Sequence, residues 1–384
     1  MSLFTKAPKN LRLVAAASFV VMFAFGIYNA TYYNFITEVI KINPSDLGRL
    51  EAARELPGLL MVFFGIITSR FADRTTGILS ALIAAIGFSA YTRLSGVPSL
   101  MLWTFVWSIG MHMWFPLQTS LIISFAPKGE EGRYAGFSSS VTAAAQVGGM
   151  LLVALAAGRL SYTEWYYLVA GLMIPGAALL AFVPKRVGSP ARDSLALRKK
   201  FRHYYVLTFL EGCRKQVFIT FAVYVLTREF HTPLKIVALL MLINNIANTF
   251  GYPLTGKLAD RIGERLILQV SYFLLIFVYL GYAFSKNVWV LYAMYILDNV
   301  FYFSTLCLTT YVKGIATREE LLTAMSTGQT FNHLAACIVP VAGGLAWAKF
   351  GYSYTFMASM LIVIFSCFYA RHVPTKLGKE AAGA

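Results

Sequence analysis

Long apolar runs alternate with short polar or Gly/Pro-rich segments along the whole chain. Each run approaches the ~20 mainly apolar residues that a helix needs to cross a bilayer. The pattern predicts an all-α polytopic membrane protein with twelve spans. These spans are 13–36, 47–69, 77–94, 99–125, 134–158, 165–183, 204–227, 235–256, 265–284, 288–312, 322–346 and 352–371.

The composition supports this interpretation. The chain is 58% hydrophobic and 13% charged, with a mean hydropathy of +0.64, whereas soluble domains are about half apolar. A soluble fold is therefore excluded. The first apolar run lacks a small-residue cleavage site, so we expect a retained span rather than a signal peptide. The four cysteines lie within apolar runs without CxxC spacing, which predicts packing residues rather than disulfides or metal ligands.

The longest polar interruption follows the sixth span and reads "PKRVGSPARDSLALRKKFRHYY". It divides the chain into two groups of six spans. We therefore expect an N-terminal bundle over 1–184, a basic linker over 185–203, a C-terminal bundle over 204–372 and a tail over 373–384.

The net charge of +16 reflects where the basic residues lie. Of the 33 Lys and Arg, twenty-two fall on the side of the N-terminus and nine on the opposite side. Because basic residues are retained on the cytoplasmic side, both termini are expected in the cytoplasm. The membrane is expected to be the inner membrane of a bacterium. No exposed domain carries a basic patch, so no nucleic-acid partner is expected. We also expect the protein to be a monomer. The last two cations, Arg214 and Lys215, lie inside a span.

A short motif occurs in both halves. "SRFADRTTG" follows the second span and "GKLADRIGER" follows the eighth, which places Asp73 and Asp260 187 residues apart. Repeated halves related by an axis along the membrane normal are one recurrent plan of transporters.

The second copy, from Gly256 to Arg265, resembles the loop signature of the major facilitator superfamily, Gly-x-x-x-Asp-Arg-x-Gly-x-Arg. The first copy departs from it: Ser69 replaces the opening Gly, and Gly77 stands one place late. The resemblance covers nearly the whole chain. It implies two pseudo-symmetric six-helix bundles that move a solute by alternating access, with helices one, four, seven and ten lining the cavity.

The motif has a physical interpretation as a cytoplasmic gate. Asp260 is expected near a helix N-terminus, where the macrodipole favours a carboxylate. Arg261 and Arg265 could bind carboxylates or helix ends, and Gly256 and Gly263 would allow a tight turn and a close helix approach. Asp73 and Arg74 are the corresponding residues of the first copy. An ordinary charged loop would explain the arginines but not the ordered Gly–Asp–Gly spacing.

The seventh span carries Glu211, Arg214 and Lys215 within one and a half turns. The two cations are ~15 Å from its inner end, near the middle of a ~30 Å core. A charge there costs roughly 2.5–3.5 kcal/mol on insertion scales, so these groups should face protein or a wet cavity. Asp298 in the tenth span reaches a similar depth. Arg214 or Lys215 is expected either to pair with Asp298 or to receive an anionic group of a solute, and a purely structural salt bridge is the alternative.

Further candidates lie on other spans. Gln216, Asn299 and Asn29 could give polar support to a solute, and Trp107 and His112 lie near mid-depth in span four. A lone His is more often a packing residue, although its pKa permits protonation at working pH. Glu55, near the outer start of span two, could be part of an extracellular gate, a proton-sensitive carboxylate or part of a snorkelling pair. The polar faces with Asn244, Asn245 and Asn248, and with Gln329, Asn332 and His333, are expected to tie helices together.

The leading hypothesis is a secondary transporter of a small anionic or zwitterionic solute, with proton coupling through Asp298, Glu211, Glu55 or His112 as an open option. One alternative is an exporter of amphipathic drugs or metabolites. Another is a polytopic membrane enzyme that uses His112 and Asp298, but no nucleophile stands beside them and we do not expect an enzyme. The chain has no Walker loop, so ATP-driven transport is not expected. No cofactor and no metal site are expected, because candidate ligands are scattered over separate spans.

Overall fold

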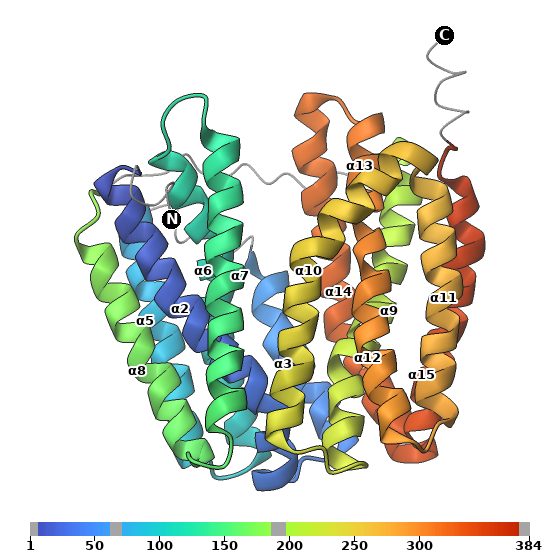
Figure 1. Cartoon of the computed structure of the whole chain (residues 1–384), viewed down its shortest axis with the longest axis horizontal. Coiled ribbons are helices and arrows are strands. Elements are labelled where there is room, and N and C mark those ends of the chain that lie inside the picture. The colour runs from blue at the N-terminus through green and yellow to red at the C-terminus, as the bar shows by residue number, and fades with distance from the viewer. Residues whose placement is uncertain (1–6, 62–70, 186–196, 376–384) are drawn as a thin grey trace. The chain divides into compact units, whose positions relative to one another are not determined.

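The computed structural model describes residues 7–61, 71–185 and 197–375, without the side chains of Arg318 and Glu319. Within these ranges the chain forms helices and no strands (Figure 1). The end of the second predicted span, the middle of the linker and most of the tail lie outside the described residues.

Twelve spans are present among the described residues, close to the predicted boundaries. Most helices extend a few residues beyond the apolar run. The bounds are α2 Lys9–Asn34 with a π-helical extension Phe35–Val39, α3 Pro44–Leu59, α5 Asp73–Ala90, α6 Val97–Ser124, α7 Glu131–Ala156, α8 Tyr162–Ala181, α9 Arg202–Arg228, α10 Leu234–Ile262, α11 Glu264–Phe284, α12 Val288–Tyr302 continued by α13 Leu306–Ile315, α14 Arg318–Phe350 and α15 Tyr352–Tyr369.

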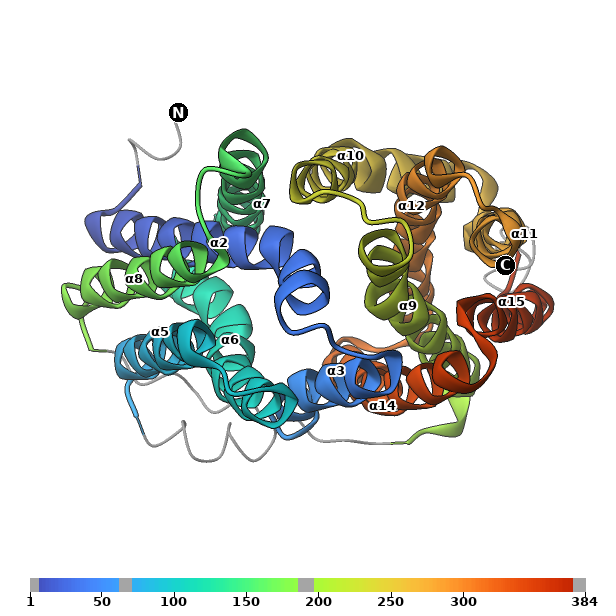
Figure 2. The same ribbon diagram turned by 90° about the horizontal axis from the view of Figure 1, so that it is seen from below.

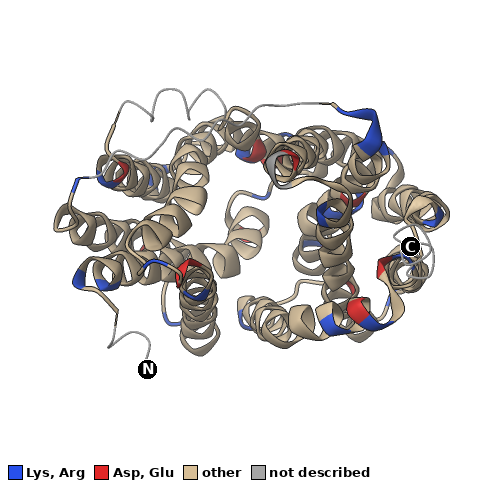
Figure 3. Cartoon of the chain, turned by 90° about the horizontal axis from the view of Figure 1, so that it is seen from above, with Lys and Arg blue, Asp and Glu red and all other residues tan. Residues whose placement is uncertain are grey.

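Ten of these spans are long and apolar enough to cross a membrane by composition alone. The two others are α3, of which only 16 residues are described, and α9, which carries Glu211, Arg214 and Lys215 in its middle. Most of the ribbon in Figure 3 is uncharged, because charged residues are so few. The charges within α9 therefore call for a specific explanation.

The chain divides into two compact units. The first comprises Met1–Lys41, Ala53–Ala191 and Pro233–Leu242, and the second comprises Ile42–Ala52, Arg192–Thr232 and Ile243–Ala384. This division differs from a single cut at the linker in two short segments. The start of α3 belongs to the second unit, and the start of α10 belongs to the first.

In the first unit, α2 packs against α7 and α8, and α5 packs against α6 and α8 (Figure 2). Small residues allow these helices to approach closely, as is common between membrane helices. A Cβ on Gly26 of α2 would lie 2.5 Å from the carbonyl oxygen of Gln146 on α7. The same holds between α5 and α6, where a Cβ on Gly87 would lie 2.6 Å from Trp107.

In the second unit, α9 packs against α14 and α15, and α11 packs against α12 and α15. The C-terminal end of α9 also holds the segment before α3. Tyr224 and Arg228 donate hydrogen bonds to the carbonyl of Ile42, at 2.5 and 2.7 Å. Together with the close packing of Gly48 against Pro340 of α14, this contact ties residues 42–52 to the second unit.

Several helix ends follow directly from the sequence. A capping box of Ser161 and Glu164 starts α8, and one of Thr317 and Glu320 starts α14, which satisfies backbone N–H groups that the first turn leaves without helical partners. Gly263 separates α10 from α11 with a φ of 87°, a conformation that glycine adopts readily.

The tenth span is broken, which the sequence analysis did not predict. Its helix α12 ends at Tyr302, a short 3₁₀ segment covers Phe303–Thr305, and α13 continues the span. The hydroxyls of Ser304 and Thr305 each donate to the backbone carbonyl three residues earlier, at 2.9 Å. Such back-bonding bends membrane helices. The ring of Phe303 fits beside Gly251 of α10, where any Cβ would overlap it.

Candidate functional site

One face of α9 presents a row of polar side chains. Tyr204, Thr208, Glu211 and Lys215 follow one another at spacings of three or four residues, which places them on the same side of a helix. The first three are buried and Lys215 is partly exposed. This row is the structural basis of the site, because the cavity and the ion pairs described below both adjoin it.

Arg214 lies beside this row and has no solvent exposure. Its Nε and Nη2 atoms donate to the two carboxylate oxygens of Glu211, the former at 3.3 Å. Its Nη1 atom donates to Asp298 of α12 at 3.2 Å. The pairing of Arg214 with Asp298 that the sequence suggested is therefore present, and Glu211 completes a buried triad.

The triad is electrostatically demanding. Two carboxylates face one guanidinium, and the side chain of Asp298 is only 10% exposed. Desolvated charges are tolerated only with good geometry and hydrogen bonds, and removing one partner of a buried pair typically costs about 3–5 kcal/mol. The Arg214 backbone carbonyl also accepts a hydrogen bond from Tyr279 of α11 at 3.0 Å. Three helices thus meet at one charged point.

Lys215 supplies a second cation next to the triad. Its Nζ lies 5.3 Å from the ring centroid of Tyr302, and Cζ of Arg214 lies 5.4 Å from the same centroid. Both distances are within the range of a cation–π interaction. With Lys215 included, the charges number two positive and two negative.

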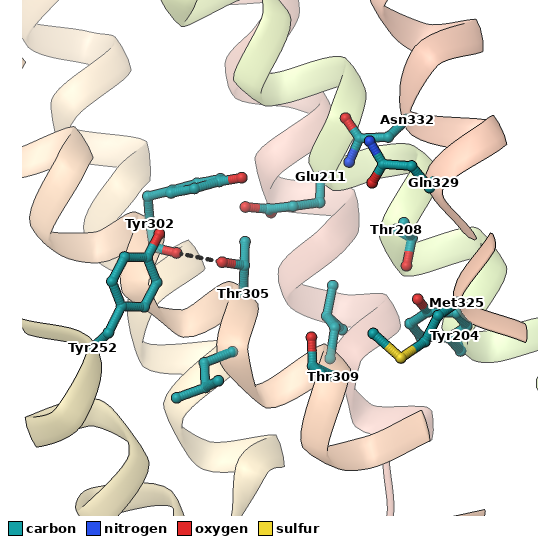
Figure 4. A pocket seen from close by; sticks show the side chains of 12 residues that line it. Tyr204, Thr208, Glu211, Tyr252, Tyr302, Thr305, Thr309, Met325, Gln329 and Asn332 are labelled. Atoms are coloured by element: carbon teal, nitrogen blue, oxygen red, sulfur yellow. Dashed lines mark hydrogen bonds between the residues drawn. The ribbon is translucent and has the colours of Figure 1, made fainter. Parts of the chain in front are cut away.

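A cavity of about 300 Å³ adjoins the row on α9 (Figure 4). Its walls come from α9, α10, the broken tenth span and α14, all within the second unit. In Figure 4 the carboxylate of Glu211 and the hydroxyl of Tyr302 point toward each other. The lining residues are Tyr204, Thr208, Glu211, Tyr252, Tyr302, Thr305, Leu306, Leu308, Thr309, Met325, Gln329 and Asn332.

Glu211 is therefore shared between two features. It lines the cavity, and it binds Arg214 through both of its oxygens. A solute that approaches Glu211 and a proton that alters the triad would each change the environment of the same carboxylate. The arrangement can couple solute binding to a change of charge.

Two other sequence candidates in this unit lie away from the cavity. Asn299 donates to the backbone carbonyl of Asn244 at 3.2 Å and to the side chain of Asn248 at 3.1 Å. These contacts tie α12 to α10, as was expected for the polar face of span eight. Gln216 is buried on α9, and neither residue lines the cavity.

The candidates on α2 and α6 belong to the first unit. Trp107 is buried, donates to the hydroxyl of Tyr91 at 3.0 Å and stacks against Phe88 with ring centroids 4.9 Å apart. Asn29 is partly exposed. The geometry thus gives Trp107 a packing role, while a role in solute binding stays a prediction for both residues.

The structure brings together His112 and Glu55, which the sequence placed on separate spans. A ring nitrogen of His112 and a carboxylate oxygen of Glu55 lie within 4.8 Å. The Nδ1 atom of His112 lies 3.0 Å from the hydroxyl of Ser108, and Glu55 forms an ion pair with Arg54 at 3.1 Å. The proton-coupling role of Glu55 stays a prediction.

The first copy of the gate motif binds a helix end. Asp73 is the first residue of α5, and Nη1 of Arg74 donates to the carbonyls of Ala181 and Val183 at 3.1 and 3.0 Å. These carbonyls lie at and just beyond the end of α8, where a cation is favoured by the helix dipole.

The second copy differs from expectation at two residues. Asp260 was expected near a helix N-terminus but lies in the last turn of α10, because that helix continues to Ile262 and ends only at Gly263. The acidic residue in the first turn of α11 is Glu264. A Cβ on Gly256 would make only ordinary contact, 3.5 Å from Leu306, so close approach does not require this glycine. The gating roles of Arg261 and Arg265 stay predictions.

The sequence analysis missed most of the cavity. Tyr252, Tyr302, Thr305 and Met325 were not singled out, and Gln329 and Asn332 were expected only to tie helices together. A signal was present in the i, i+4, i+7 spacing of Met325, Gln329 and Asn332, which matches the spacing of Tyr204, Thr208 and Glu211. The break at Phe303–Thr305 had no proline or glycine to mark it.

A bundle of apolar helices with a polar cavity beside a buried ion triad is the arrangement expected of a membrane transport protein. The chain belongs to the Major Facilitator Superfamily, whose family model matches residues 14–208 and 204–384. The two matches agree with the internal repeat around Asp73 and Asp260.

Known proteins of similar sequence and structure agree with this assignment. Multidrug resistance protein MdtG of Serratia proteamaculans (strain 568) is 23% identical over 345 residues, which cover 83% of this chain and 84% of that protein. The crystal structure of the nucleoside transporter NupG superposes with a TM-score of 0.78 at 13% identity, covering 95% of this chain and 99% of NupG. A bacterial homologue of the human lysosomal transporter Spinster gives a TM-score of 0.74 at 15% identity, covering 94% and 95%.

Proposed function

We propose that this transporter couples the movement of a small polar organic solute to the movement of protons. The observation that carries the proposal is the position of Glu211, which binds Arg214 within the buried triad and also lines the cavity. The solute would bind in that cavity, and the triad would carry the proton.

The coupling follows from charge balance. Asp298 is buried and holds Arg214 through a single hydrogen bond at 3.2 Å, whereas Glu211 binds it through both oxygens. Protonation of Asp298 would remove one negative charge and weaken its hold on α9. Because α9 and α12 are joined by this pair, protonation would favour a different packing of the two helices. A solute at Glu211 would stabilise one of the two arrangements.

Arg214 is occupied by carboxylates, and neither Arg214 nor Lys215 lines the cavity. An anionic or zwitterionic solute stays a prediction. We further propose that the solute is released chemically unchanged, that the protein acts as a monomer in a bacterial inner membrane, and that both termini are cytoplasmic. The distribution of Lys and Arg supports this orientation.

Solute uptake into proteoliposomes tests the proposal. A panel of sugars, nucleosides, amino acids, organic acids and dyes is offered with and without a pH gradient. We expect a transported solute to accumulate only with the gradient. Asp298→Asn should abolish that accumulation, while Asp46→Asn, at a partly exposed carboxylate that binds Arg49, should not. Equal accumulation with and without the gradient would refute proton coupling.

A second candidate function is export of amphipathic drugs, which the similarity to a multidrug resistance protein favours. It predicts that cells producing this protein lose a hydrophobic dye faster than cells without it, and that Arg214→Ala retains export of neutral dyes if the variant folds. Dye retention equal to that of cells lacking the protein would remove this candidate.

A further inference from the structure

The cavity beside α9 is lined almost entirely by uncharged polar groups and apolar backing. Among its twelve described lining residues, Glu211 alone is charged. Hydroxyl groups come from three tyrosines and three threonines, and amides come from Gln329 and Asn332. Leu306, Leu308 and Met325 supply apolar contact. Small-molecule sites typically combine such a surface with a few polar groups that fix orientation.

The one carboxylate in the wall is already compensated. Both oxygens of Glu211 accept from Arg214, which has no solvent exposure and does not line the cavity. The ammonium of Lys215 lies over the ring of Tyr302 and is likewise not among the lining groups. An anion in the cavity would therefore find no cation among the lining groups to bind.

A cation would also gain little here. The charge of Glu211 is paired with Arg214, and Lys215 balances the second carboxylate of the triad, so an added cation would meet no unbalanced negative charge. The charge pattern thus disfavours a net charge of either sign in the part of the solute that occupies the cavity.

The hydroxyl groups suit a partner that both donates and accepts hydrogen bonds. Each Ser, Thr or Tyr hydroxyl has one donor and two acceptor positions. Thr305 uses its proton on the carbonyl of Tyr302 at 2.9 Å, so toward the cavity it offers acceptor positions. The amides of Gln329 and Asn332 carry both functions. A solute with several hydroxyl or amide groups can satisfy donors and acceptors together.

We propose that the cavity binds a small uncharged solute with several hydroxyl or amide groups, the chemistry of a monosaccharide or polyol. This inference rests on the proposed transport function and narrows its substrate class. A volume of about 300 Å³ lies at the lower end of ligand sites, which limits the solute to a small molecule.

Paired solutes test the inference with the full chain in proteoliposomes. Pentoses, hexoses, N-acetylhexosamines and polyols are each compared with the counterpart that carries a carboxylate or phosphate, such as glucose with glucuronate. We expect accumulation of at least one uncharged solute and none of its charged counterpart. Uptake of only charged solutes, or of no member of the panel, would overturn the inference.

Lining-residue variants then locate the site. Thr305→Val and Gln329→Leu should each raise the half-saturating concentration of the transported solute about tenfold, the effect of leaving one polar group without its hydrogen bond. Thr310→Val is the matched control, since Thr310 lies on the same span and also donates to a carbonyl three residues earlier, but does not line the cavity. Gln269→Leu on α11 is the control for the amide. Equal effects of lining and control variants would contradict the inference.

Thr309→Val distinguishes weaker solute binding from a folding defect. Thr309 lines the cavity but is exposed, so its substitution should not disturb the packing of the helices. The two proposals also fail separately. Gradient-driven uptake of a charged solute alone would overturn the substrate class and leave proton coupling intact. Uptake of an uncharged solute that ignores the pH gradient would overturn the coupling and leave the substrate class intact.

Discussion

At the residue scale, the behaviour of α9 is governed by how its buried charges are paired. Sequence reasoning could place Arg214 and Asp298 at similar depth, because depth follows from residue number along a helix. It could not show that Glu211 binds Arg214 through both oxygens while lining a cavity. That geometry depends on rotamers and on the packing of α14 and the broken tenth span, which no local pattern encodes.

Loss of Arg214 should be the most damaging change in this region. Arg214→Gln leaves Glu211 and Asp298 buried without a cation, so we expect a loss of about 3–5 kcal/mol in stability. This loss of stability is measured by thermal unfolding of the purified protein, with size-exclusion chromatography as the readout of the folded fraction. Arg133→Gln is the control, because Arg133 is 57% exposed and forms only a surface ion pair with Glu130. If both variants unfolded at the same temperature, the triad would contribute little to stability.

Asp298→Asn should be milder than Arg214→Gln. The amide oxygen can still accept from Arg214, and Glu211 keeps its two bonds to the guanidinium, so no cation is left unpaired. The variant should therefore fold and insert normally and unfold at a higher temperature than Arg214→Gln. The opposite order would mean that Asp298, rather than Glu211, is the main partner of Arg214.

At the scale of elements, apolar runs located the spans well. The reason is that a chain within lipid must form helices, whose backbone N–H and C=O groups hydrogen-bond to one another. The boundaries were set too short where charged or polar turns continue a helix, as at Asp260 in α10. The break at Phe303–Thr305 was missed because it depends on Gly251 of another helix. A contact between helices far apart in sequence cannot be inferred from the tenth span alone.

Two glycines of α10 provide a matched test of this break. Gly251→Ala places a Cβ against the ring of Phe303, whereas Gly256→Ala meets Leu306 only at 3.5 Å. Both Gly→Ala substitutions raise the intrinsic helix propensity of α10 by a similar amount. Gly251→Ala should lose about 1–3 kcal/mol through overpacking, measured by thermal unfolding, while Gly256→Ala should be neutral or stabilising. Equal effects would show that Phe303 does not depend on Gly251.

At the scale of the whole molecule, the sequence repeat, the charge distribution and the family match agree on one architecture. Two units of helices carry copies of one loop motif, and the basic residues gather on one side of the predicted spans. The exchange of 42–52 and 233–242 between units could not be read from the sequence. It depends on tertiary contacts such as those of Tyr224 and Arg228 with Ile42.

The predicted orientation can be checked with reporter fusions. A fluorescent protein fused to the C-terminus should fluoresce in bacterial cells, and alkaline phosphatase at the same position should be inactive, because the C-terminus is expected in the cytoplasm. The reverse pattern would place the C-terminus outside and would require a different account of the basic residues.

The central claim, that the triad beside the cavity links solute to proton, is tested most directly by proton movement that the solute itself induces. Proteoliposomes containing a pH-sensitive dye are given a transported solute without any imposed gradient, and solute exchange is measured in parallel. The wild-type protein should shift the internal pH on solute addition, whereas Asp298→Asn should exchange solute with no pH change. Proton movement in Asp298→Asn equal to that of the wild type would contradict the account.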